Sequence, residues 1–152
     1  MFKFFSVIFI VLIFFGCEKK DITSVQKVHW DRDMCERCKM VVSDRKHTVE
    51  VINAKTGKKY LFDDIGCMML WFDEEDISWK DSAIIWITDV KTGEWIDARS
   101  AYYDTMNLTP MSYGIGAHKK RSDIKDGEEV LDFTTIKPHI LKIENQLNKK
   151  SH

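Results

Sequence analysis

A strand–turn–strand pattern that occurs twice constrains the fold of this chain more than any other feature of its sequence. Apolar and polar side chains alternate on both sides of a turn that contains glycine, which predicts an antiparallel hairpin. The turns are Lys55-Thr56-Gly57 and Lys91-Thr92-Gly93, 36 residues apart, and the strand-like segments are residues 48–52, 58–62, 83–88 and 94–98. Two such hairpins in a chain of 152 residues fit one or two small domains.

Helical segments are predicted after both hairpins. Residues 65–72 follow Asp63 and Asp64. Both acids are candidate N-caps, because their side chains can accept hydrogen bonds from the free backbone N–H groups of a first turn. A second helix is expected to begin within residues 100–103.

A weaker third copy of the pattern lies near the C-terminus. Residues 128–133 predict a strand, and residues 134–147 predict a helix from an apolar stripe with helical spacing. Pro138 is compatible with that helix only in its first turn. Together these hairpin-then-helix units predict an α+β fold of two small repeated subdomains, residues 31–104 and residues 105–148.

The start of the chain predicts an export signal. Lys3 precedes an apolar run, and the polarity changes abruptly at Cys17. This pattern favours a lipoprotein signal peptide at residues 1–16 and a lipid on Cys17, with an uncleaved anchor or an ordinary signal peptide as alternatives. The protein is then expected in the cell envelope, lipid-anchored to a membrane on the extracytoplasmic (periplasmic) side. A polar tether at residues 17–30 and a disordered tail at residues 149–152 complete this arrangement.

The net charge argues against a nucleic-acid-binding protein, and the cysteine content argues against a protein stabilised mainly by disulfides. A net charge of −1 gives no basic face, so no nucleic-acid partner is expected. With Cys17 lipidated, three of the four cysteines remain. An odd number of thiols in an oxidising compartment leaves at least one unpaired within the chain, so a disulfide framework is not their main use. Metal binding or redox chemistry is favoured instead.

The sequence Cys35-x-x-Cys38-x-Met40 is the strongest candidate for chemistry. Its two thiols are spaced to chelate one ion, and Met40 adds a thioether. Such soft ligands favour Cu(I) over magnesium or calcium. Three alternatives stay open: a tetrahedral zinc site completed by Cys67 and a histidine, a thioredoxin-like redox pair, and a structural disulfide.

Other candidate residues carry weaker signals. Cys67 lies in a segment that is apolar on nearly every face, which favours a place in the core. Met111 lies in a loop between Pro110 and Gly114 and is expected to be exposed. His118 precedes a basic run and is expected to be a solvated loop residue. The sequence has no serine–histidine–acid grouping and no phosphate-binding glycine loop, so the chain is expected not to be an enzyme.

Four motifs follow one another between about residues 33 and 118. They are Cys35-x-x-Cys38-x-Met40, Phe62-Asp63-Asp64-Ile65-Gly66-Cys67-Met68, Trp95-Ile96-Asp97-Ala98 and Pro110-Met111-x-x-Gly114-Ile115. Their order and spacing resemble those of the NosL family, the lipoprotein accessory factors of nitrous oxide reductase. The resemblance implies a fold similar to the small repeated units of the organomercurial lyase family.

The resemblance also implies a function. It predicts a membrane-anchored copper chaperone that delivers Cu(I) to apo nitrous oxide reductase, with Cys35, Cys38, Met40 and Met111 as ligands. Delivery would proceed by stepwise ligand exchange, the thioether leaving first. The runner-up hypothesis is an extracytoplasmic thiol oxidoreductase that acts on a partner's cysteines. A third hypothesis is a structural lipoprotein with a Cys35–Cys38 disulfide.

The chain departs from the family at three positions. Glycine is usual where this chain has Lys39 and common where it has Ser112, and phenylalanine is common where it has His118. Losing a glycine restricts the backbone of a loop, which would affect how Met40 approaches a metal. His118 is either an additional ligand peculiar to this chain or without a role at the site.

Overall fold

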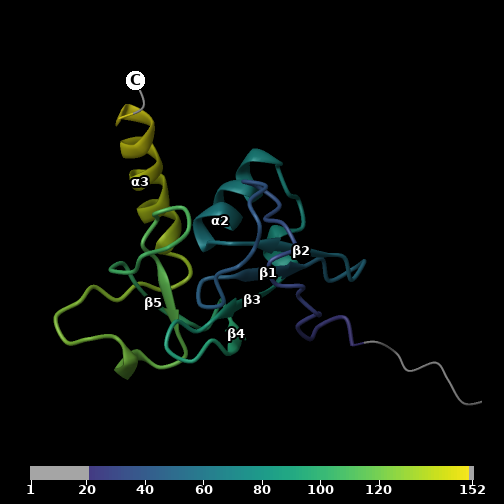
Figure 1. Cartoon of the computed structure of the whole chain (residues 1–152), viewed down its shortest axis with the longest axis horizontal. Helices are drawn as coiled ribbons and strands as arrows, with labels where there is room; N and C mark the ends of the chain where they lie inside the picture. Colours follow the sequence, from purple (N-terminus) through teal and green to yellow (C-terminus); the bar gives the residue numbers. More distant parts are fainter. Residues whose placement is uncertain (1–20, 151–152) are drawn as a thin grey trace, which may run out of the picture.

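The computed structural model describes residues 21–150, so the predicted signal peptide and Cys17 lie outside the described residues. At its centre is a four-stranded antiparallel sheet with the strand order β2-β1-β3-β4 (Figure 1). Its strands are β1 (Val49–Ile52), β2 (Lys59–Phe62), β3 (Ile84–Thr88) and β4 (Trp95–Asp97).

Both predicted hairpins are confirmed, and they lie side by side in this one sheet. Strand β1 pairs with β2 and with β3, so that Val49 lies opposite Phe62 on one side and Ile87 on the other. The turn glycines Gly57 and Gly93 have φ angles of 69° and 74°, in the left-handed region that glycine adopts at little cost.

Helix α2 (Ile65–Glu74) confirms the first predicted helix. Asp64 is its N-cap, and its carboxylate accepts a hydrogen bond from the Gly66 N–H across 2.7 Å. Every residue from Ile65 to Phe72 is buried, as expected for a helix that is apolar on nearly every face. The prediction that Asp63 also serves the helix as a cap is wrong, since its side chain takes part in a different cluster.

A second, two-stranded sheet pairs β5 (Tyr102–Asp104) with β6 (Gly116–His118). The helix expected within residues 100–103 is therefore wrong, because these residues lead into strand β5. The strand expected at residues 128–133 is reduced to a single bridge between Leu131 and Tyr103. The expected division of the chain at residue 104 falls between the two strands of this sheet.

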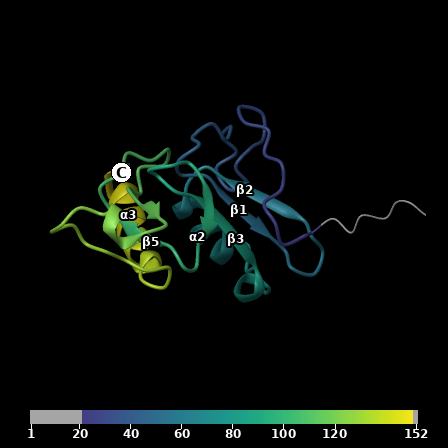
Figure 2. The ribbon, with the colours of Figure 1, turned by 90° about the horizontal axis from the view of Figure 1, so that it is seen from below.

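Helix α3 (Ile136–Lys150) confirms the predicted C-terminal helix, with Pro138 in its first turn. Ile136 and Ile140 are fully buried. Helix α2 contacts both α3 and β2, and it lies between the sheet and α3 in the two views of Figures 1 and 2. Short 3-10 turns occur at η2 (Lys80–Ser82) and η3 (Arg121–Asp123).

The described part of the segment expected to be a tether is attached to the sheet. The ring of Trp30 stacks on Trp95 with centroids 6.3 Å apart, and Trp86 Nε1 donates to the carbonyl oxygen of Thr23 across 3.0 Å. Within residues 21–150, no helix combines the length and the apolar character needed to cross a membrane.

Candidate metal centre

Four side chains from three separate segments converge on one point. Cys35 and Cys38 lie in a turn before β1, Asp63 directly follows β2, and Cys67 lies in the first turn of α2. One donor atom from each of these residues lies within 4.8 Å of all the others. The three cysteines are free thiols.

The turn that carries the first two thiols is closed by its own backbone. The Cys35 N–H donates to the Met40 carbonyl oxygen across 2.8 Å, and the Lys39 N–H donates to the Cys35 carbonyl oxygen across 3.1 Å. The Glu36 N–H donates to the Leu61 carbonyl oxygen across 2.8 Å and so fixes the turn to β2. Both sulfurs are thereby held beside the residue that follows β2, which is how Asp63 comes to face them.

Asp63 supplies a carboxylate that sequence reasoning assigned to helix capping. It is only 2% exposed, and its Oδ2 atom accepts a hydrogen bond from the Cys38 thiol across 3.3 Å. Its Oδ1 atom is buried without a hydrogen-bond partner among the described residues. A buried carboxylate oxygen without a partner is costly, so this atom fits a site made to receive a cation.

Cys67 is both a core residue and a member of the cluster. Its side chain is fully buried, as the sequence predicts, and so is that of Cys35. Cys38 is half-buried and is the most accessible of the three thiols. The cluster therefore has a closed inner side and an open side at Cys38.

The thiols differ in acidity because they touch one another. Contact with the Cys67 thiol lowers the pKa of Cys35 to about 6 against the opposing effect of burial, and the backbone N–H groups of Asp63 and Cys38 lower it further. The same contact, together with burial, raises the pKa of Cys67. Burial raises the pKa of Cys38 to about 12. A metal that binds all three sulfurs must therefore displace protons from Cys38 and Cys67.

Arg37, between the two cysteines of the turn, connects the cluster to both helices. Its guanidinium donates to both carboxylate oxygens of Glu74 across 2.8 and 2.9 Å, and to the Tyr113 hydroxyl across 3.5 Å. That hydroxyl donates to Glu144 Oε2 on α3 across 2.7 Å. Sequence reasoning missed this role, because no local pattern relates Arg37 to acids so far along the chain.

The two candidate thioether ligands lie in different environments. Met40 is 48% exposed at the end of the cysteine turn. Met111 was expected to be exposed, but it is half-buried and packs against the core. Burial raises the pKa of Asp64, and the side chain of Thr109 and the backbone N–H groups of Gly66 and Met111 oppose that shift. The loop that carries Met111 therefore lies against the start of α2, near Asp63 and Cys67.

His118 is not the solvated loop residue that the sequence predicts. It is 5% exposed, and its Nε2 atom is 2.8 Å from Asp104 Oδ2 across the β5–β6 pair. Asn107 Nδ2 donates to the other oxygen of the same carboxylate. His118 is not a member of the four-residue cluster. Its contact with Asp104 joins the last residue of β6 to the residue that precedes the loop carrying Met111.

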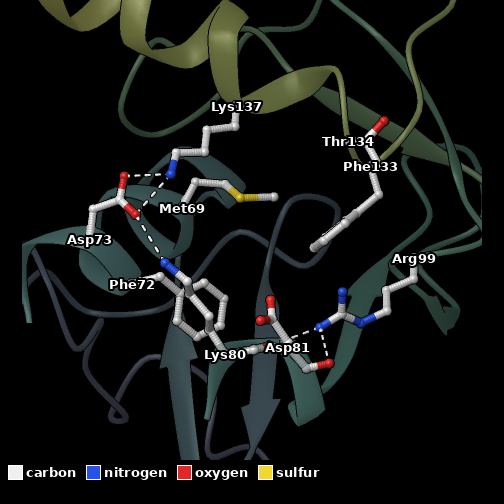
Figure 3. A pocket seen from close by; sticks show the side chains of 9 residues that line it. All are labelled: Met69, Phe72, Asp73, Lys80, Asp81, Arg99, Phe133, Thr134 and Lys137. Atoms are coloured by element: carbon white, nitrogen blue, oxygen red, sulfur yellow. Dashed lines mark hydrogen bonds and ion pairs between the residues drawn. The ribbon is translucent and has the colours of Figure 1, made fainter. Parts of the chain in front are cut away.

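A cavity of about 300 Å³ lies elsewhere, between α2, η2 and the start of α3 (Figure 3). Its lysines Lys80 and Lys137 both pair with Asp73, and Arg99 donates to backbone carbonyl oxygens of η2. Its cationic side chains are thus engaged by acceptors of the protein itself. The cavity offers a metal ion no cluster of ligands comparable to that around Cys35.

One of three comparisons with known proteins finds a similarity. No family model matches the sequence, and no curated protein does. Among solved structures, the chain is similar to the crystal structure of the copper chaperone NosL from Shewanella denitrificans, with a TM-score of 0.61 and 15% sequence identity. The match covers 74% of this chain and 95% of that one. The chain has a NosL-like fold. At this level of identity the likeness establishes the architecture, and the cysteine cluster independently fits a metal-binding role.

Proposed function

We propose that this protein is a non-catalytic copper carrier that binds Cu(I) and delivers it to apo nitrous oxide reductase. The observation that carries the proposal is the meeting of three cysteine sulfurs and one carboxylate within 4.8 Å, in a fold similar to that of a copper chaperone. Thiolates are soft ligands, and soft ligands select Cu(I).

The closed inner side and the open side of the cluster suit a metal ion that is transferred to another protein. The buried sulfurs of Cys35 and Cys67 would hold the ion, and the half-buried Cys38 would be its accessible ligand. Met40 and Met111 would supply neutral thioethers at the outside of the site. A receiving protein would replace the thioethers first, then the Cys38 thiolate and finally the two inner thiolates. Copper stays monovalent throughout, and each released thiolate recovers a proton from solvent.

The proposal also includes the place where transfer occurs. The apolar start of the chain and Cys17 support a lipid-anchored protein on the extracytoplasmic side of a membrane. A carrier held there would meet exported apo reductase within a short distance of the membrane surface.

Titration of the reduced protein with Cu(I) against a competing chelator tests the proposal. We expect one tight site per chain, loss of that site in the Cys35→Ser/Cys38→Ser double variant, and weaker binding in Cys67→Ser. Glu36→Gln is the matched control, because it changes a polar residue of the same turn outside the cluster. Equal Cu(I) affinity in the parent and the double variant would exclude the site. Transfer is then measured as copper gained by apo reductase from the loaded protein.

The lowered pKa of Cys35 favours a second candidate function, that of a thiol oxidoreductase. A redox-active pair needs its low-pKa thiol at the surface, where it can attack a disulfide. Here that thiol is fully buried, and the accessible Cys38 has a raised pKa. We therefore expect slow reaction with a small-molecule disulfide at neutral pH. Fast exchange that Cys35→Ser abolishes would favour the oxidoreductase instead.

A further inference from the structure

The loop between β5 and β6 exposes two large apolar side chains. Met106 is 76% exposed and Leu108 is 91% exposed, the highest exposed fractions among the large hydrophobic residues that the structure describes. No residue from 105 to 117 carries a charged side chain, although 31% of the residues in the chain are charged. Single exposed apolar side chains are common, but two of them together on an uncharged loop form a candidate contact surface.

Asn107, between these two residues, is held on the inner side of the loop. Its Nδ2 atom donates to the buried carboxylate of Asp104, and its backbone N–H donates to the Gly114 carbonyl oxygen across 3.1 Å. A Cβ atom added to Gly116 would lie 2.3 Å from Asn107 Nδ2, so the amide fills the space beside that glycine. The two apolar neighbours of Asn107 are therefore exposed in a conformation that hydrogen bonds of the loop itself hold in place.

The far end of the loop is also held in place. The Gly114 N–H donates to Thr109 Oγ1 across 3.2 Å, and the Ser112 N–H donates to the Thr109 carbonyl oxygen across 3.0 Å. Thr109 is 5% exposed, and its side chain lies beside Asp64, the N-cap of the helix that carries Cys67. A loop that is ordered before binding loses little conformational freedom on binding, so its apolar side chains give a larger net affinity.

The chemistry of the loop favours a protein partner over a lipid surface. The centres of protein interfaces are enriched in methionine and depleted of lysine and acidic residues, and residues 105–117 have this composition. Segments that bind membranes usually add lysine or arginine for anionic headgroups, and residues 105–117 contain neither. A charged partner group would lose its hydration against this loop without gaining a countercharge, so the surface that fits the loop is uncharged and apolar.

We propose that Met106 and Leu108 dock the protein into an uncharged apolar socket on the protein that receives its copper. The inference rests on the proposed copper transfer, which supplies the partner, but it concerns a surface that holds no metal. Met111 follows Leu108 by three residues, so docking of this loop brings the receiving protein next to a candidate ligand. The two apolar side chains determine how fast copper is transferred at low partner concentration, and they leave the affinity for copper unchanged.

The rate of copper transfer from the loaded protein to apo nitrous oxide reductase, measured over a range of reductase concentrations, tests this inference. The Met106→Ser/Leu108→Ser double variant removes both apolar side chains. Leu147→Ser is the control, because Leu147 is an exposed apolar residue of α3 outside the loop. Burial of one large apolar side chain corresponds to about a tenfold change in affinity. We expect the double variant to need about tenfold more reductase, or more, for half of the maximal rate.

Two further measurements on the same variants separate docking from metal binding and from folding. The Cu(I) affinity of the double variant, measured against a competing chelator, and its midpoint of urea unfolding should both equal those of the parent. The control should equal the parent in transfer as well. Weaker Cu(I) binding by the double variant would overturn the inference, because the two side chains would then act on the metal site.

Transfer is measured with the carrier in detergent and again in vesicles of phosphatidylethanolamine and phosphatidylglycerol. Equal slowing of the double variant in both supports a protein partner, whereas slowing in vesicles alone would overturn the inference, because the loop would then contact lipid. A double variant that transfers copper like the parent would overturn the inference and leave the proposed function intact. A parent that transfers no copper to the reductase would contradict the proposed function, and with it the partner named here.

Discussion

The aromatic ring of Tyr113 occupies the space that a side chain at position 66 would need. A Cβ atom added to Gly66 would lie 2.1 Å from Tyr113 Cδ2, far inside van der Waals contact. Gly66 immediately precedes Cys67, and Tyr113 lies two residues after Met111. This contact therefore places the Met111 loop directly against the part of α2 that carries a candidate ligand.

Gly66→Ala should destabilise the protein, although alanine is normally the better helix former. Glycine-to-alanine exchange inside a helix ordinarily gains about 0.5–1 kcal/mol. Here the new methyl group must displace a buried ring, and such overpacking costs about 1–3 kcal/mol. The free energy of unfolding from urea titration measures the net change. In a Tyr113→Ala background the cost should disappear or change sign, and an unchanged cost there would show that the ring is not its cause.

Arg37→Lys should loosen the connection between the cysteine turn and the two helices. Lysine keeps the charge but cannot contact both oxygens of Glu74 at once. Because Glu74 is about half exposed, the expected loss of stability is modest, about 0.5–1 kcal/mol. Metal affinity should fall with it, since the turn holds two of the clustered thiols. Lys39→Gln is the control, because Lys39 has 63% of its side chain exposed, and it should leave both measurements unchanged.

The sequence predicts the outer parts of this site better than its interior. The Cys-x-x-Cys turn can be recognised in the sequence as a candidate site because its two thiols are close to each other along the chain. Asp63 is not recognised as a site residue, because helix capping is a sufficient local explanation for it. Cys67 is considered as a ligand only in the zinc alternative, because its apolar surroundings favour a place in the core. Two adjacent acids before a helix still carry a signal. Only one can be its N-cap, and Asp64 takes that role, which leaves Asp63 for another purpose.

In the fold as well, the sequence predicts the elements that depend on neighbouring residues and not those that depend on contacts between distant segments. Period-two alternation predicts β1 to β4, the two acids before residue 65 predict the start of α2, and helical spacing predicts α3, since each of these signals lies within a short stretch of sequence. The sequence predicts the start of a helix within residues 100–103, where the structure has the beginning of strand β5, because the three residues of β5 are strand-like only through pairing with β6 beyond an intervening loop. The contact between Arg37 and Glu74 is likewise absent from any short window of sequence.

Asp89→Asn should destabilise the protein at neutral pH and matter less in acid. Burial alone would raise the pKa of Asp89, but hydrogen bonds from Lys119, Thr92 and Lys91 lower it below the usual value. A carboxyl with a lowered pKa stabilises the fold above its unfolded pKa, and this contribution is lost as the pH falls through the lower, folded value. The variant should lose about 1–2 kcal/mol at pH 7. The difference from the parent should shrink below about pH 4.

Asn53, in the matching turn of the first hairpin, shows why Asp89→Asn should keep part of the hydrogen bonding of Asp89. Its Oδ1 atom accepts from the N–H groups of Lys55 and Thr56, as Asp89 Oδ1 does from those of Lys91 and Thr92. An asparagine at position 89 can keep the turn but not the charge-assisted bond that Oδ2 accepts from Lys119 N–H. Asp126→Asn, at an exposed site, is the control and should change stability by less than about 0.5 kcal/mol. A pH-independent difference between Asp89→Asn and the parent would contradict the assignment.

Met40→Ala and Met111→Ala should separate ligand and packing roles. If both thioethers contact copper, both variants should bind Cu(I) more weakly than the parent in chelator competition. Met40 is 48% exposed, so its loss should change stability by less than about 0.5 kcal/mol. Met111 packs against the core, so its loss should cost about 1–2 kcal/mol. Met106→Ala, at a 76% exposed position of the same loop, should alter neither property. Parent-like Cu(I) affinity in Met111→Ala would make Met111 a packing residue alone.

Ser112→Gly should stabilise the protein, because Ser112 has a φ of 62° in the left-handed region. That conformation costs a residue with a Cβ atom about 1–2 kcal/mol, whereas glycine adopts it freely and loses about 0.5–1 kcal/mol through its greater freedom in the unfolded chain. The expected net gain is about 0.5–1 kcal/mol in urea unfolding. Lys39→Gly should behave in the same way, since Lys39 has a φ of 59° at the end of the cysteine turn. Ser112→Ala and Lys39→Ala keep the Cβ atom and should bring no gain. Equal stabilisation by alanine and glycine would mean that lost side-chain contacts, rather than relief of the backbone, explain the effect.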